Sequence, residues 1–260
     1  MHDNLGDRMK KNYENITRTF LPRRTYTIIR LDGKAFHTFT RGLNRPWDED
    51  LIDIMNDVTK SLCANIQGAK LGYTQSDEIT IVMTDFDSLE TDAWYGGNIQ
   101  KIVSVSASMA TAYFATFMNK KSVDSEELNG TSKWWGRTAM FDARTYTIPS
   151  RNEVINNLVW RQKDAERNSV QMLAQSLYSQ KKLNGKNIQT QKEMCLKEGK
   201  DWETDAADKR GRMLYLQTKW KMSADSFDEP YAEREWIWVD DCPIFTENWG
   251  MFDKILPVLE

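Results

Sequence analysis

The fold is decided by residues 26–37, which read YTIIRLDGKAFH, together with residues 76–83, which read SDEITIVM. In the first stretch a β-branched run ends directly in Asp32 and Gly33, which is typical of a strand that runs into a tight turn. In the second stretch a polar turn precedes another apolar run. Between them, residues 48–67 carry apolar side chains at helical spacing. The sequence therefore predicts a strand over 25–32, a helix over 48–67, and two further strands over 70–75 and 78–84.

The connections between these elements bring two acidic residues together. A right-handed crossover makes the strands over 25–32 and 70–75 parallel, and the short turn that follows makes the third strand antiparallel, between or beside them. If the third strand lies next to the first, Asp32 and Asp77 face each other at one edge of the sheet. Asp-Gly alone is a common turn signal, so the pair of acids carries the prediction. Two carboxylates beside the Gly33 carbonyl suit a hard divalent cation such as Mg²⁺.

The rest of the chain completes a mixed fold. The order βαββαβ predicts an α+β, ferredoxin-like fold with a palm-type antiparallel sheet, of the kind found in polymerases and cyclases. We expect residues 1–150 to form a palm-like catalytic domain and residues 151–260 a C-terminal helical and β extension packed on it as one compact unit. A capping box at Ser150 and Glu153 starts its first helix. The remaining predicted elements are helices over 3–18, 98–119, 150–178 and 187–198, a loop over 128–135, a strand over 138–148, and a hairpin or small β element over 212–218 and 236–239.

Four short motifs give the chain a family resemblance. They read RLDGKAFH at 30–37, GYTQSDE at 72–78, FDAR at 141–144 and WRQKD at 160–164. In this order and spacing, over about residues 5–200, the chain resembles the tRNA-histidine guanylyltransferase family. That family adds nucleotides to the 5′ end of RNA in the 3′–5′ direction, and the resemblance implies the same palm-type fold.

One segment departs from the guanylyltransferases proper. They follow the Trp-Arg-Gln motif with His-Ile-Asn-Asn, whereas this chain has ERNS at 166–169. The segment resembles the guanylyltransferase-like branch, whose members are template-dependent RNA 5′-end polymerases. The expected function is therefore template-dependent 3′–5′ nucleotidyl transfer that repairs the 5′ end of tRNA or tRNA-like RNA. Addition of a single G at position −1 of tRNA-His is the alternative.

The resemblance also implies roles for individual residues. Asp32 and Asp77 are expected to be catalytic and, with the Gly33 carbonyl, to hold two Mg²⁺ ions. Backbone amides just after Gly33 suit a triphosphate. For Arg161, pairing with Asp164 on its own helix is a competing interpretation. The residues expected to bind nucleotide are Asp32, Gly33, Lys34, Ala35, Phe36, His37, Ser76, Asp77 and Lys101, and those expected to contact phosphate or RNA are Arg144, Arg161 and Asn168.

The expected substrates follow from the same family. ATP or GTP activates the 5′-monophosphate of an RNA with an incomplete 5′ end, and the 3′-hydroxyl of the incoming nucleotide then attacks it. The family commonly assembles as tetramers, so a homotetramer is expected. A nucleotidyl cyclase or conventional palm polymerase is a second enzyme interpretation, against which the Trp-Arg-Gln helix argues. A non-catalytic RNA-binding relative remains the non-enzyme alternative.

Composition sets broad limits. The 260 residues are 40% hydrophobic and 28% charged, as in ordinary globular proteins, and the net charge of −3 argues against a protein that coats nucleic acid through bulk charge. Basic residues do gather in 8–24 and 181–221, where salt-sensitive phosphate contacts and a solvated surface are equally good explanations. The three cysteines lack metal-ligand spacing. With no leader and no long apolar run evident, the expectation is a reduced, cytoplasmic protein.

Overall fold

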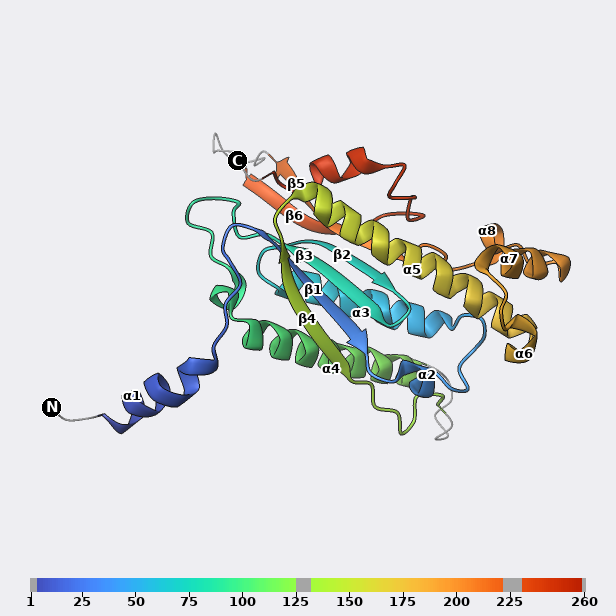
Figure 1. Ribbon diagram of the computed structural model, residues 1–260, viewed down its shortest axis with the longest axis horizontal. Helices are drawn as coiled ribbons and strands as arrows, with labels where there is room; N and C mark the ends of the chain where they lie inside the picture. The colour runs from blue at the N-terminus through green and yellow to red at the C-terminus, as the bar shows by residue number, and fades with distance from the viewer. Residues whose placement is uncertain (1–3, 125–131, 222–230, 259–260) are drawn as a thin grey trace.

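The sheet is the centre of the molecule and has six strands in the order β4-β1-β3-β2-β5-β6. This computed structural model describes residues 4–124, 132–221 and 231–258. Every neighbouring pair is antiparallel, so β1 and β2, which flank β3, are parallel to each other as the sequence predicted. Figure 1 shows the strands side by side. Their bounds are β1 Tyr26–Gly33, β2 Ala69–Gln75, β3 Glu78–Met83, β4 Phe141–Ile148, β5 Arg212–Lys221 and β6 Tyr231–Trp238.

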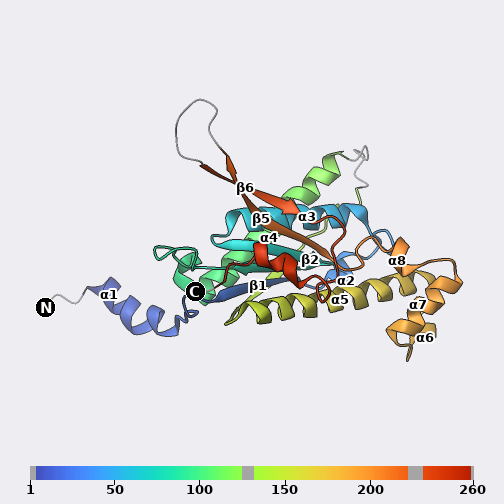
Figure 2. The ribbon, with the colours of Figure 1, turned by 90° about the horizontal axis from the view of Figure 1, so that it is seen from above.

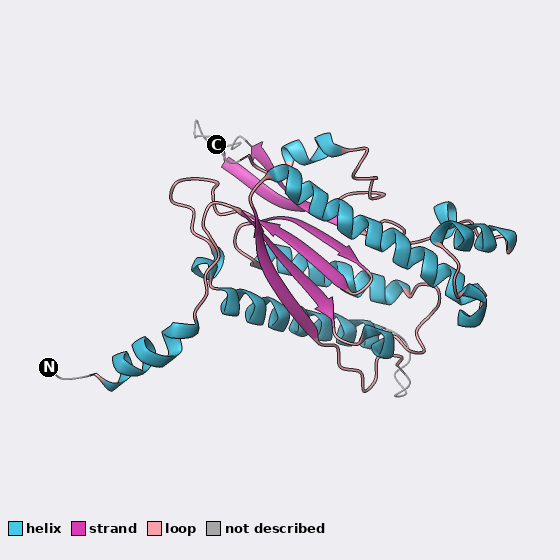
Figure 3. Cartoon of the chain, viewed as in Figure 1, coloured by secondary structure: helices cyan, strands magenta, loops and turns pink. Residues whose placement is uncertain are grey.

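Helices cover both faces of the sheet. Two of them, α3 and α4, lie on one face, and the long helix α5 lies on the other (Figure 3). The arm that α1 begins projects away from the body, and none of its helical residues is buried (Figure 2). The helical bounds are α1 Leu5–Met9, η1 Lys10–Glu14, η2 Asn15–Thr17, α2 Phe36–Phe39, α3 Glu49–Asn65, η3 Trp94–Gly97, α4 Ile99–Asp124, α5 Arg151–Leu177, α6 Gln180–Leu183, α7 Ile188–Lys197, α8 Trp202–Asp205 and η4 Trp249–Lys254.

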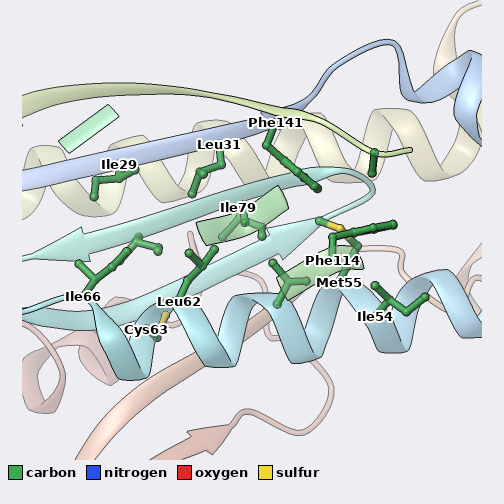
Figure 4. Close-up of a cluster of buried hydrophobic side chains, with 14 of the residues drawn as sticks. Ile29, Leu31, Ile54, Met55, Leu62, Cys63, Ile66, Ile79, Phe114 and Phe141 are labelled. Carbon is green, nitrogen blue, oxygen red and sulfur yellow. The ribbon is translucent and has the colours of Figure 1, made fainter. Parts of the chain in front are cut away.

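The larger core lies between the sheet and the helices α3 and α4. Alternate residues of a strand point to opposite faces, so Ile29 and Leu31 of β1 and Ile79 of β3 enter the same layer. Figure 4 shows these side chains packed against Met55 and Leu62 of α3. The start of α3 is fixed by Asp48, whose carboxylate accepts a hydrogen bond from the Leu51 amide at 3.2 Å.

A second core lies on the α5 face and joins the two ends of the chain. Tyr26 and Val82 of the central strands pack there with Leu158 of α5 and with Phe245 and Phe252 near the C-terminus. The C-terminal hairpin also extends the central sheet, because β5 pairs with β2. The α+β, palm-type fold class is therefore confirmed. The division at residue 150 stays a prediction.

Most predicted elements are found with shifted ends. The strand predicted over 138–148 begins at Phe141, because its partner β1 ends at Gly33, directly opposite Phe141, and leaves the preceding residues no strand to pair with. The helix predicted over 98–119 continues to Asp124. The connection between β5 and β6, and residues 128–131 of the loop predicted over 128–135, fall outside the described residues. Among the helices that the structure describes, none combines the length and apolar character needed to cross a membrane.

Candidate active site

The two predicted acids lie at the same end of the sheet. Asp32 is the last residue but one of β1, and Asp77 lies in the turn between β2 and β3. The Gly33 amide donates to the Asp77 carbonyl at 3.1 Å, which ties the end of β1 to this turn. The strand register also places Asp32 directly opposite Glu78. Asp32 and Asp77, which the strand–helix–strand pattern predicts to face each other, therefore lie at the same end of the sheet.

The turn that carries Asp77 is held in an unusual backbone conformation. Ser76 has φ +49°, which non-glycine residues rarely adopt, and its hydroxyl donates to Asp77 Oδ1 at 3.1 Å. Its amide donates to Asp208 Oδ2 at 3.3 Å, a contact from the C-terminal part of the chain. Burial first, and then the nearby charge of Asp32, raise the pKa of Asp77 to about 6, although the hydrogen bond from the Ser76 hydroxyl acts in the opposite direction.

The donor set around these acids fits Mg²⁺. Magnesium is usually bound through one or two carboxylates, while water and substrate phosphates supply the remaining ligands. Asp32 and Asp77 supply two carboxylates, and the Gly33 carbonyl lies on the same strand end. Within 4–124, 132–221 and 231–258, no group of three or more His, Cys, Asp or Glu side chains is placed to hold a metal by itself. A site of this kind would be completed by the phosphates of a bound nucleotide.

The loop after β1 forms one wall of a cavity beside the acids. The cavity has a volume of about 520 Å³, and Gly33, Ala35, His37, Ser76 and Asp77 contribute to its lining. A Cβ at position 33 would lie 2.2 Å from the Phe36 ring, so this position requires glycine. Phe36 itself is 5% exposed and faces the core, where it anchors the loop.

One of the predicted phosphate-binding amides already has a backbone partner. The Lys34 amide donates to the Met140 carbonyl at 2.8 Å. Ala35 has φ +55° and precedes the short helix α2. The His37 ring lies 3.0 Å from the Thr38 hydroxyl and lines the cavity. The roles of these loop residues in binding nucleotide stay predictions.

The face of the sheet beneath α5 is charged next to the acids. Arg161 of α5 is 3% exposed, and its Nε lies 3.2 Å from Glu78 Oε1. It also pairs with Asp164 and stacks on Trp160, with 3.9 Å from its guanidinium carbon to the ring centroid. Burial raises the pKa of Glu78, and the charge of Arg161 partly offsets this. In this structure two carboxylates engage Arg161, so its contact with phosphate stays a prediction.

The position of Glu78 was not predicted from the sequence. Its place opposite Asp32 depends on strand register, for which the sequence holds no direct signal. The register also sets Asp142 of β4 opposite Asp32 on the other side. The Asp142 side chain is 54% exposed and lies 3.6 Å from Arg144 Nη2. The FDAR motif, which contains both residues, was the available signal for this contact.

Of the other residues predicted to contact phosphate, nucleotide or RNA, Arg144 and Asn168 lie near the acids and Lys101 lies far from them. Arg144 lies on β4 with a side chain that is 55% exposed, near the acid end of the sheet. Asn168 of α5 donates to Gln75 Oε1 at 3.4 Å, beside the turn that carries Asp77. Lys101 lies apart from both, near the start of α4, and its Nζ is 5.7 Å from the Tyr95 ring centroid. That region contacts the segment before β1, so Lys101 and Asp32 lie at opposite ends of the strand.

Comparison with known protein families shows to which family this chain belongs. The profile of the family described as tRNAHis guanylyltransferase matches residues 6–149, more than half of the chain. The chain belongs to this family. The family is one of nucleotidyltransferases, so the family and enzyme class predicted from the sequence motifs are confirmed. The match includes β1, the acid-bearing turn and β4.

The curated proteins that resemble this chain match it over only part of their own length. An uncharacterized protein of Acanthamoeba polyphaga mimivirus is 31% identical over 203 residues, which are 70% of this chain and 66% of that protein. The tRNA(His) guanylyltransferase of Schizosaccharomyces pombe is 31% identical over 162 residues, which are 62% of this chain and 56% of that protein. The chain thus spans between about half and two thirds of these relatives.

Solved structures of similar proteins match almost the whole chain. A bacterial tRNA(His) guanylyltransferase-like protein in complex with ATP has a TM-score of 0.79 and 37% identity, over 95% of this chain and 97% of that chain. A bacterial guanylyltransferase-like protein in complex with GTP gives 0.71 and 36%, over 96% and 97%. The Saccharomyces cerevisiae tRNA(His) guanylyltransferase, at 0.67 and 21%, shares the fold. These likenesses agree with the predicted guanylyltransferase-like branch.

Proposed function

We propose that this family member is a template-dependent 3′–5′ nucleotidyltransferase that repairs the 5′ end of tRNA or tRNA-like RNA. The observation that carries the proposal is the pair Asp32 and Asp77, which lie together beside a cavity large enough for a nucleotide. The similar bacterial proteins in complex with ATP and GTP support nucleotide binding by this chain. The segment 166–169 supports the templated reaction over addition of a single G.

The residues at the strand ends have different proposed roles in phosphoryl transfer. Asp32, Asp77 and the Gly33 carbonyl would hold two Mg²⁺ ions, which neutralise charge on the transferred phosphate and its leaving oxygen. The hydrogen bond from the Ser76 hydroxyl orients the Asp77 carboxylate. Gly33 lets the Phe36 ring pack against the end of β1, because any side chain at position 33 would meet that ring. Buried Arg161 holds Glu78 in place opposite Asp32.

The proposed reaction has two steps with balanced leaving groups. In the first step, an oxygen of the RNA 5′-phosphate attacks the α-phosphorus of a nucleoside triphosphate, and pyrophosphate leaves. The 3′-hydroxyl of an incoming nucleotide then attacks the activated 5′-phosphate, loses its proton and displaces the nucleoside monophosphate. The exposed Arg144 is proposed to contact RNA phosphates. Lys101, expected from the sequence to bind nucleotide, lies away from the acids, so a contact with RNA phosphate is proposed for it in place of nucleotide binding. A homotetramer is the proposed assembly.

A truncated tRNA tests this function directly. The protein is incubated with Mg²⁺, each labelled NTP in turn, and tRNAs that lack their first 5′ nucleotide and carry each of the four bases opposite the gap. We expect the added nucleotide to follow Watson–Crick pairing with the opposing base. Addition of G opposite every base, and only to tRNA-His, would instead establish single-G addition. Absence of any addition, with RNA binding independent of Mg²⁺, would favour a non-catalytic RNA-binding relative.

A further inference from the structure

The turn that precedes β4 carries two adjacent tryptophans in opposite environments. Trp134 is 3% exposed and stacks on Phe39 of α2, with 6.2 Å between the ring centroids. Trp135 is 80% exposed. The first ring therefore anchors the turn to α2, and the second projects into solvent. The mechanism described above uses neither ring.

Hydrogen bonds hold this turn against the loop that follows β1. The Arg137 guanidinium donates to the Phe39 carbonyl, to the Arg41 carbonyl at 2.9 Å and, within the turn, to the Lys133 carbonyl at 2.6 Å. Thr40, between the first two of these carbonyl groups, lines the nucleotide cavity. Figure 1 shows the segment that leads into β4 next to α2. The exposed ring is therefore carried by a fixed support beside the walls of the proposed active site.

The segments around this ring are basic on a protein that is acidic as a whole. Residues 33–46 and 132–141 together contain five Lys or Arg and no Asp or Glu, whereas the net charge of the chain is −3. Two of the five, Arg41 and Arg45, are exposed, and neither forms an ion pair with any residue that the structure describes. A second copy of the chain would bring the same cations to a two-fold interface, where they would repel each other. The phosphates of an RNA are the better match.

We propose that Trp135 is a stacking platform for unpaired nucleotides of the RNA 3′ strand, an inference that rests on the proposed repair of the RNA 5′ end. When the 5′ end reaches the acids, the unpaired part of the opposing 3′ strand must lie at the same end of the sheet. An aromatic ring accepts any base, because every base has a flat face, and Arg41 and Arg45 contact the phosphates of the same strand. The platform therefore holds the template strand without restricting its sequence.

RNA-binding measurements with two hairpins test the inference without relying on turnover. One hairpin has a recessed 5′ end and unpaired 3′ nucleotides, which include the fluorescent base 2-aminopurine, and the other has a blunt end. Affinities are measured for the wild-type protein, Trp135→Ala, and Trp135→Phe, which keeps an aromatic ring. Leu89→Ala is the control, because Leu89 is 84% exposed and lies at the other end of β1, where its carbonyl accepts from Arg24 at 3.1 Å. Melting temperatures are recorded in parallel.

The expected pattern is specific to stacking. Trp135→Ala should bind the recessed hairpin about 5- to 150-fold more weakly than the wild-type protein, and the blunt hairpin within about twofold of it. The quenching of 2-aminopurine fluorescence on binding should be lost in Trp135→Ala and retained in Trp135→Phe and Leu89→Ala, because only an aromatic ring stacks on the base. All melting temperatures should stay at the wild-type value, since the substituted side chains are exposed.

Other outcomes overturn the inference in distinguishable ways. Unchanged binding of the recessed hairpin by Trp135→Ala, or an equal loss for both hairpins, would remove the platform and leave the proposed function intact. Unchanged RNA binding together with a smaller assembly in sedimentation would make Trp135 part of an interface between copies of this chain. Failure of the wild-type protein to bind either hairpin would overturn the proposed function as well.

Discussion

The two faces of strands β1 and β3 differ in chemistry along the same length of strand, because alternate residues point to opposite faces. On the face toward α3 and α4, Ile29, Leu31 and Ile79 are fully buried in an apolar layer. On the face toward α5, Asp32 lies opposite Glu78 near the same strand ends, and Arg161 pairs with Glu78. One strand therefore contributes to folding through alternate residues and to the proposed site through the others. Substitutions on the two faces should affect different measurements.

The largest expected effect comes from the acids themselves. Asp32→Ala and Asp77→Ala should each lower nucleotide addition by about 10³-fold or more, because each removes a proposed ligand of the metal ions that stabilise the transition state. The melting temperature should not fall, since each change removes one of two carboxylates that repel each other. Turnover is measured at fixed Mg²⁺. Normal turnover by either variant would remove this pair from the mechanism.

The apolar face should respond through stability. Phe114 is fully buried, with ring centroids of Phe36 and Phe39 at 5.6 and 5.4 Å. Phe114→Ala should lower the free energy of unfolding by about 3–5 kcal/mol, as in other large-to-small core substitutions. Urea denaturation measures this change, and Phe20→Ala is a matched control because Phe20 is 54% exposed. A similar loss in both variants would contradict the division between the faces.

Arg161 should affect both measurements, since it is buried on the charged face. Arg161→Ala leaves Glu78 and Asp164 without this cation, and we expect the free energy of unfolding to fall by about 3 kcal/mol. The value of kcat/KM should also fall, by about 10- to 150-fold if the guanidinium contacts phosphate. Arg161→Lys keeps the charge but not the planar fork, and separates the two effects. Kinetics and stability both at wild-type levels would contradict this assignment.

The smallest effect is expected at the far end of the sheet. Lys101 is exposed and lies away from the acids, so Lys101→Ala should raise KM for RNA about 2- to 10-fold at low salt and leave KM for NTP unchanged. The effect should shrink as salt concentration rises, because it depends on displaced counterions. The exposed Lys200 provides a control substitution. A KM for RNA that stays unchanged at low salt would contradict a phosphate contact.

Local sequence patterns were sufficient to predict the elements and the acid pair. The β-branched run before Asp32 and the polar turn at Ser76 mark strand ends through short-range preferences that the fold retains. The predicted helix cap at Ser150 is present, with the Glu153 amide donating to the Ser150 hydroxyl at 3.3 Å, while the Glu153 carboxylate accepts from Asn156 at 2.8 Å. These features depend on a few neighbouring residues, which explains why they could be read directly.

Contacts between distant residues could not be predicted in the same way. Trp47 and Asp208 both line one small cavity, although more than 150 residues separate them. The position of Glu78 opposite Asp32 depends on a register that a one-residue shift would change entirely. The burial of Arg161 depends on how α5 lies across the sheet. None of these follows from spacing along the chain.

The pairing of β5 with β2 has a consequence for how this protein can be engineered. Because Phe245 and Phe252 pack against Tyr26 and Val82, the C-terminal residues complete a core that the early strands begin. A fragment that ended at residue 150 would expose that apolar layer to water and would tend to aggregate. The segment before residue 150 is therefore a poor unit for transplantation into a chimera. Circular permutation, which keeps every strand, is the better route to relocating the chain ends.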